Sequence, residues 1–359
     1  MTASLKPAAI TVATLALLAL AWPAAAQPVQ FTPPPAPAAK PRATTPRASK
    51  PSVPTPQAKP TSPSPDAINP DAIIRGQEPD LAYGAFQRGY YLTALAQATR
   101  RVEEKTDPKA MTLLGELYAA GLGVPRDEAK AVQWFKQATD RGDASAMFAL
   151  ASFRFTGRGG PVDRAESARL LASAAALGYA PAAYDLGLLY LEGQQFPQDI
   201  ARAAELFRTA ANAGYSEAQY ALATLYKEGR GVSQDVGEAA RLLAAAALAG
   251  NSDAMVEYAI ALFNGAGTTK DEAAAAALFL KAARKGSPIA QNRLARILST
   301  GQGMPANPLE AIKWHLIAKA GGASDPYLDD YMLKQKAETR AAAQQAAEPW
   351  LVAIARSRS

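Results

Sequence analysis

Apolar residues recur through most of this chain at the three- and four-residue spacing of amphipathic helices. The spacing predicts one helix over about residues 109–120 and a second over about 127–141. Their core-facing positions are Ala110, Leu114, Leu117 and Tyr118 in the first helix and Ala131, Trp134, Phe135 and Ala138 in the second. One such pair cannot bury its apolar face alone, so pairs must stack on each other.

The helix pair recurs every 36 residues, six times in succession. Three sets of equivalent residues, here called registers, recur at this spacing. Chance alone would not preserve three registers over six periods. They are Gly142, Gly178, Gly214, Gly250, Gly286 and Gly322; Asp127, Asp163, Asp199, Asp235, Asp271 and Asn307; and Ala138, Ala174, Ala210, Ala246, Ala282 and Ala318. A period of this length predicts an all-α solenoid over residues 107–322.

Each register has a physical cause. The Asp/Asn residue precedes the second helix, where its side-chain oxygen can cap free backbone N–H groups. The glycine follows that helix, where the chain turns with positive φ. A small residue, Gly115 in the first repeat, lets the second helix approach closely. Two glycines also occupy the loop inside most units, but the third repeat has Gln195 at the second position, so we expect its loop to differ.

Atypical helices are expected at both ends, because the end of a solenoid exposes half a core. Residues 76–106 contain a tetratricopeptide-like helix pair, and residues 323–359 contain capping helices. We expect the latter to be one helix from about Ser324 to Ala346 and another from Pro349 to Ala355, because proline suits a first helical turn.

The first 75 residues do not follow the helical pattern. Residues 1–26 resemble a secretory signal, with Lys6, an apolar stretch and a cleavage site after Ala26, which predicts a periplasmic or secreted protein. The alternative is an inner-membrane anchor formed by residues 8–26. Residues 27–75 are expected to be a disordered linker. Residues 27–65 of this linker contain 13 prolines and no acidic residue. Two roles are compatible with this composition: a solvated spacer, or a basic segment that contacts membrane or peptidoglycan.

The net charge of +6 belongs to this N-terminal part. Its six cationic residues, Lys6, Lys40, Arg42, Arg47, Lys50 and Lys59, account for the whole excess. The chain from Asp66 onward is neutral in sum, so nucleic acid is not an expected partner.

Residues that carry chemistry are scarce. The chain has no cysteine, which excludes thiol nucleophiles and cysteine-ligated metals. The single histidine, His315, occupies the core slot that Phe135 fills in the first repeat, and we expect it to be packed with one ring nitrogen bonded. No nucleophile, metal-ligand cluster or phosphate loop accompanies it, so we expect no catalytic residue, cofactor or metal, and no enzyme.

Two segments of the first repeat resemble the Sel-1-like repeat family, relatives of the tetratricopeptide repeat. They are Leu114-Gly115-Glu116-Leu117-Tyr118-Ala119-Ala120-Gly121 and Ala131-Val132-Gln133-Trp134-Phe135-Lys136-Gln137-Ala138. The resemblance covers about 107–322 and implies a right-handed α/α solenoid whose first helices line a concave side. The second repeat departs from it, with Arg154 at the position of Tyr118.

The first helix of each unit also has a face turned away from the core, read at positions equivalent to 112, 116 and 119. In the middle repeats this face is apolar, which is typical of a binding surface. The candidate partner-binding residues are Phe148, Phe155, Tyr184, Leu188, Leu191, Tyr220, Val256, Ile260 and Phe263. The alternative is that they pack between neighbouring repeats. The equivalent residues at one such position, called a column here, can also behave differently from those at another, with the columns at 112 and 119 divided into one packed and one exposed.

These observations favour a non-enzymatic protein-binding scaffold of the bacterial envelope. It would hold a partner peptide or helix in the concave groove, with a regulatory role among those the resemblance implies. The alternative is a structural protein tethered to the envelope through its basic proline-rich arm.

Overall fold

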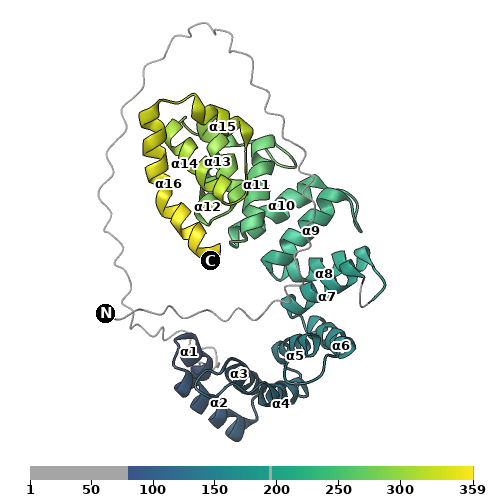
Figure 1. The fold of residues 1–359 in the computed structure, drawn as a ribbon. Helices are drawn as coiled ribbons and strands as arrows, with labels where there is room; N and C mark the ends of the chain where they lie inside the picture. The colour runs from purple at the N-terminus through teal and green to yellow at the C-terminus, as the bar shows by residue number, and fades with distance from the viewer. Residues whose placement is uncertain (1–79, 194–195, 359) are drawn as a thin grey trace, which may run out of the picture. The chain divides into compact units, whose positions relative to one another are not determined.

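The computed structural model describes residues 80–193 and 196–358, and within these ranges the chain forms sixteen α-helices and no strand (Figure 1). Two helices precede the repeats, α1 (Leu81–Gln87) and α2 (Tyr91–Lys105), and two follow them, α15 (Pro326–Leu333) and α16 (Ala337–Arg358). The first helices of the six repeats, called A helices here, are α3 (Pro108–Ala120), α5 (Ala144–Thr156), α7 (Ala180–Glu192), α9 (Ser216–Glu228), α11 (Ser252–Asn264) and α13 (Pro288–Thr300). The second, or B, helices are α4 (Glu128–Thr139), α6 (Arg164–Ala176), α8 (Ile200–Asn212), α10 (Val236–Leu248), α12 (Glu272–Arg284) and α14 (Pro308–Ala320).

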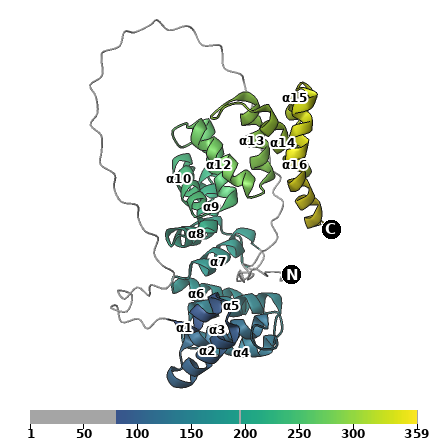
Figure 2. The same cartoon turned by 90° about the vertical axis from the view of Figure 1, so that its left-hand side faces the viewer.

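From α2 to α14, each helix packs against the helices next to it in the chain. Every A helix contacts the B helix of its own repeat and the helix before it, which is α2 for α3 and the preceding B helix for the others, and α16 lies along α14 (Figure 2). This succession of helix pairs confirms the predicted all-α solenoid. None of the helices in the described ranges is both long and apolar enough to cross a membrane.

The predicted caps are all in place at the B helices. The side chain of Asp127 accepts a hydrogen bond of 2.9 Å from the backbone N–H of Lys130, and the equivalent residue of each later repeat caps its B helix in the same way. The glycines that end the units adopt φ values between +81° and +100°. Both registers therefore mark helix ends, as the sequence predicts.

Within a repeat, the small residue of the A helix lies directly under the large core residue of the B helix. A Cβ atom added to Gly115 would meet the Phe135 ring at 2.4 Å, and one added to Gly187 would meet Phe207 at 2.6 Å. Phe135 and Phe207 are fully buried. The small side chain thus sets how closely the two helices approach.

Between repeats, the second loop glycine lies against the start of the preceding B helix. A Cβ atom on Gly267 would stand 1.9 Å from the carbonyl oxygen of Val236, and one on Gly303 would stand 2.1 Å from that of Glu272. A Cβ atom on Gly123 would meet the backbone carbonyl carbon of Tyr91 at 3.0 Å. These glycines allow backbone-to-backbone contact that any side chain would prevent. The third repeat's residue here, Gln195, lies outside the described residues.

The C-terminal helices divide at a different place from the one expected. The break falls between Leu333 and Ala337, and Pro349 lies inside α16 instead of starting a helix. An internal proline removes one backbone hydrogen bond and costs about 3 kcal/mol. The residues after it continue the helix against the core, and Trp350 packs edge-on against Trp314 of α14 with ring centroids 5.3 Å apart. Tertiary packing therefore outweighs the local signal.

The glycine contact between repeats can be tested with a matched pair of substitutions. Gly286→Ala should cost about 1–2 kcal/mol, the cost of a left-handed alanine, because nothing lies within 4 Å of the added Cβ. Gly267→Ala carries the same cost and should lose a further ~1–3 kcal/mol, because the neighbouring backbone must move. Denaturant unfolding of both variants measures the difference in the free energy of unfolding. Equal losses would contradict the role of this glycine contact in holding neighbouring repeats together.

Candidate protein-binding face

The nine candidate residues all lie on four consecutive A helices, α5, α7, α9 and α11. Two of them, Phe148 and Val256, are buried, with 2% and 5% of their surface exposed. The other seven are half-buried: Phe155, Tyr184, Leu188, Leu191, Tyr220, Ile260 and Phe263. Phe148 and Val256 therefore serve packing in this structure, while the seven combine packing with exposed surface.

The column that begins at residue 112 is a seam between repeats. At the two ends of the array the seam is polar: Thr112 donates to the carboxylate of Asp143 at 3.1 Å, and Asn292 donates to that of Asp325 at 2.9 Å. Both acceptors are the N-cap residues of the next helix in the stack, α5 and α15. The side chain at this position therefore meets the beginning of the following repeat.

In the middle of the array the same seam is aromatic. Phe148 packs against Tyr179, and Tyr184 packs against Tyr215, each with ring centroids 5.4 Å apart. Aromatic pairs of this geometry add about 0.5–1.5 kcal/mol beyond their buried area. The seam therefore holds the middle repeats together and also brings tyrosines to the half-exposed surface.

Tyr179 and Tyr215 were missed by the sequence analysis. They are the N-cap residues of α7 and α9, and neither makes a side-chain cap hydrogen bond. The equivalent residues Asp143, Asn251 and Ser287 do cap their helices. Giving up such a cap costs about 1 kcal/mol. The sequence does contain a signal for them: each is a tyrosine at a position where other repeats have a helix-capping residue.

The tyrosines on this face have phenol groups that stay neutral. Burial and, less strongly, nearby carboxylates raise the pKa of Tyr184 and of Tyr220 to about 12. The same causes raise the pKa of Tyr215 and Tyr179. Among the described residues none of the four hydroxyls takes part in a hydrogen bond. Each can therefore donate to, or accept from, a bound partner.

Carboxylates lie among these tyrosines. Asp185 is 2% exposed, and its negative charge and that of Glu217 raise the pKa of Tyr215. Asp253 and Glu257 act in the same way on Tyr220, and Glu257 also forms a 3.0 Å ion pair with Lys227. Carboxylates therefore accompany the tyrosines of this face.

The columns at 116 and 119 supply the apolar part of the face. Leu188 and Leu191 of α7, and Ile260 and Phe263 of α11, are half-buried and pack against the core cluster of buried residues. Phe155 has the guanidinium of Arg164 5.3 Å from its ring centroid. These contacts show that the side chains contribute to packing, and their role in binding a partner stays a prediction.

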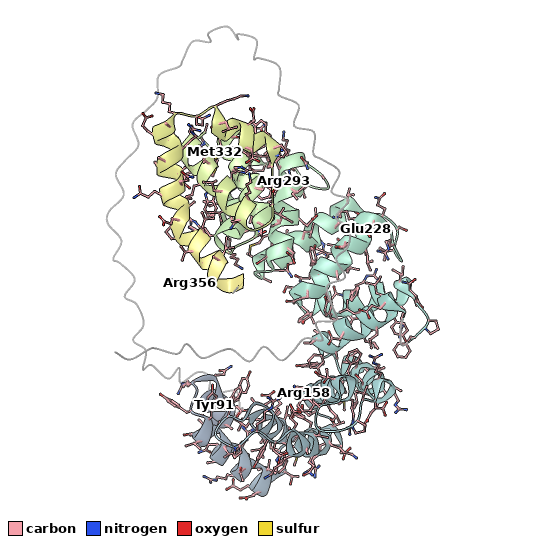
Figure 3. All side chains as sticks on the ribbon, in the orientation of Figure 1. Tyr91, Arg158, Glu228, Arg293, Met332 and Arg356 are labelled. Carbon is pink, nitrogen blue, oxygen red and sulfur yellow. The ribbon has the colours of Figure 1, made fainter. Side chains whose placement is uncertain are left out.

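Charge is separated between the two kinds of helix. The A helices of the first five repeats carry seven acidic and three basic residues, while the B helices of the same repeats carry five acidic and nine basic ones. The A helix of the sixth repeat reverses the sign, with Arg293 and Arg296 and no acidic residue. Figure 3 labels Glu228 at the end of α9 and Arg293 on α13. A sum over the repeats hides this separation.

His315 is fully buried, as expected for a core slot. Its Nε2 donates to the carboxylate of Asp329 at 2.8 Å, and Lys319 donates to the same oxygen, also at 2.8 Å. The hydrogen bonds from Lys319 and His315 lower the pKa of Asp329. Asp329 belongs to α15, so the interaction fastens this helix to α14. Within the described ranges no group of three or more His, Asp or Glu residues could hold a metal ion.

Glu116 generates a prediction about pH. Burial and, less strongly, Asp143 raise its pKa from 4.5 to about 7. Between those two pH values the unfolded chain ionises this carboxyl before the folded chain does, so the folded state loses stability as pH rises. Glu116→Gln removes that loss. The melting temperature of the variant should therefore gain on the wild type from pH 4.5 to pH 7 and then level off.

The exposed Glu103 of α2 provides the matched control for loss of one negative charge. Thermal melts of Glu116→Gln and Glu103→Gln across this range check the prediction. The same pH profile in both variants would rule out the buried position of Glu116 as the cause.

The Sel1 repeat family profile matches this chain six times, at residues 108–143, 144–179, 180–215, 216–251, 252–287 and 288–322. A Sel1 repeat protein from Oxalobacter formigenes is similar in structure, with 26% identity, a TM-score of 0.55, and coverage of 66% of this chain and 94% of that one. The protein c5321, a protective antigen of uropathogenic Escherichia coli strains with an SLR fold, is also similar in structure, with 24% identity and a TM-score of 0.50. That alignment covers 74% of this chain and 65% of c5321.

A search of curated protein sequences gave no match. The family profile, however, matches the units that the 36-residue registers define, in the same phase and without interruption. It covers more than half of the chain, and the array of helix pairs described above accounts for the match. The chain belongs to the Sel1 repeat family.

Proposed function

We propose that this protein is a non-enzymatic scaffold of the bacterial envelope that binds a peptide or helix of a protein partner on the A-helix face. This face is defined here as the half-exposed surface of α5, α7, α9 and α11 together with Tyr179 and Tyr215. The observation that carries the proposal is the presence of tyrosines at two N-cap positions. They leave helix ends uncapped and bring phenol groups to an already apolar surface.

Family membership supports the general role. Sel1 repeat proteins are generally scaffolds for protein–protein interaction and generally not enzymes. Half-exposed aromatic and aliphatic side chains on consecutive helices provide the anchors that such recognition uses. The buried members of the first column, Phe148 and Val256, support the face from beneath without offering surface of their own.

Photo-crosslinking tests this role. A photo-reactive residue in place of Leu191 or Phe263 on the A-helix face should capture a distinct envelope protein, which mass spectrometry of the crosslinked product identifies. The matched controls are Leu177 and Leu248, which are 57% and 88% exposed at the ends of B helices α6 and α10. The proposal fails if the control positions capture the same protein with equal yield.

The envelope location rests on residues 1–26, which lie outside the described residues. We propose that they direct export and are removed after Ala26. Expression of the full chain in a bacterial host should yield a periplasmic protein whose N-terminal sequence begins at Gln27. Recovery of the uncleaved chain in the membrane fraction would favour the anchor formed by residues 8–26 instead.

A further inference from the structure

The A-helix face combines phenol groups with carboxylates from α7 to α11. Tyr184 and Tyr215 stack with ring centroids 5.4 Å apart, Asp185 follows Tyr184 directly in the chain, and Glu217 is two residues after Tyr215. In addition to burial, the charges of Asp185 and Glu217 raise the pKa of both tyrosines, and those of Glu257 and Asp253 raise the pKa of Tyr220. Aromatic rings and carboxylates therefore occur together on three consecutive A helices.

Little positive charge on these helices offsets the carboxylates. Of the three basic residues on the first five A helices, Arg154 pairs with Glu166 of the B helix α6 at 2.7 Å, and Lys227 already pairs with Glu257. Lys109 is exposed near the start of α3, outside the face. Asp253 is exposed and forms no ion pair in the described chain. Carboxylates held close together repel each other, and a bound cation relieves that repulsion.

A cationic peptide fits each part of this surface. Lysine and arginine side chains pair with the carboxylates, and their cationic groups also interact favourably with tyrosine rings. Free phenol groups can donate to peptide carbonyls, and aromatic surfaces accept proline rings of an extended chain. A recurrence in successive repeats suits a segment that is extended, because such a segment presents its residues at regular intervals along the array.

We propose that the A-helix face binds an extended, cationic segment of a partner protein, with its lysine or arginine side chains at Glu217 and Asp253 and its backbone along the tyrosines. This inference rests on the proposed function and specifies the chemistry of the partner. The limit of the site is α13, which has no acidic residue; it carries Arg293 and Arg296, of which Arg296 is paired with Asp325 at 2.6 Å. The bound segment therefore lies along α7 to α11.

The experiment uses the full chain and two synthetic peptides of equal length, about twenty residues, rich in proline and free of acidic residues. One carries several lysines, and the other has glutamine in their place. Fluorescence anisotropy should give a dissociation constant at least about tenfold lower for the lysine peptide, and this preference should shrink as salt is added. Equal affinity of the two peptides would overturn the proposal.

Matched variants locate the site. Glu217→Gln combined with Asp253→Asn should weaken binding of the lysine peptide by about tenfold, because two carboxylates of the face are lost. The control is Glu205→Gln combined with Glu238→Gln, which removes the same charge from B helices α8 and α10 and should leave binding unchanged. Circular dichroism melts show whether each variant is folded. Equal loss in both double variants would overturn the assignment to this face.

Two further outcomes separate other occupants from the proposed one. If deletion of residues 27–65 raises the affinity for the lysine peptide, the basic segment of this chain competes for the face, which overturns the partner assignment. If sedimentation shows a dimer that the peptide dissociates, a second copy is the occupant, with the same consequence. Photo-crosslinking at Leu191 can also capture a partner that the lysine peptide does not displace. That result would refute only the cationic chemistry of the partner and would leave the scaffold function intact.

Discussion

Close approach of one repeat's backbone to the next is the constraint on which this structure depends. The second loop glycine leaves no room for a side chain against the preceding B helix, as the 1.9 Å separation at Gly267 shows. A small residue at the position of Gly115 does the same between the two helices of one unit. These contacts fix both the width of a repeat and its offset from the next. A single 36-residue pattern can then be repeated, because each unit that has this glycine meets the same surface.

The same regularity explains why surface and core are hard to separate in this fold. A side chain at the position of Tyr184 reaches the first turn of the following A helix, so it contributes both to the seam between repeats and to the face that a partner would meet. Thr112 and Asn292 occupy equivalent positions with purely polar contacts. The aromatic version is confined to the middle repeats, where the carboxylates also gather. The proposed recognition and the cohesion between repeats thus use the same residues.

Sequence alone predicted the elements that depend on local chemistry. The capping residues such as Asp127, the positive-φ glycines and the core slot of His315 are local or periodic features, and each is found as predicted. Pro349 was assigned wrongly, because its local preference is overridden by packing of the residues that follow it. The acidic helices were missed because the charges were summed over the whole folded part, whereas the acidic excess is concentrated on α7, α9 and α11. Which face residues are buried, as Phe148 is, depends on contacts 31 residues away.

The two uncapped helix starts have a dynamic consequence. α7 and α9 lack the side-chain acceptor that the other A helices in the repeats possess, so their first turns open at lower free energy than those of their neighbours. The least firmly closed turns of the array therefore coincide with Tyr179 and Tyr215. Any molecule that settles over these rings must hold those turns shut, and slower amide hydrogen exchange there would record its presence even without a change in the fold.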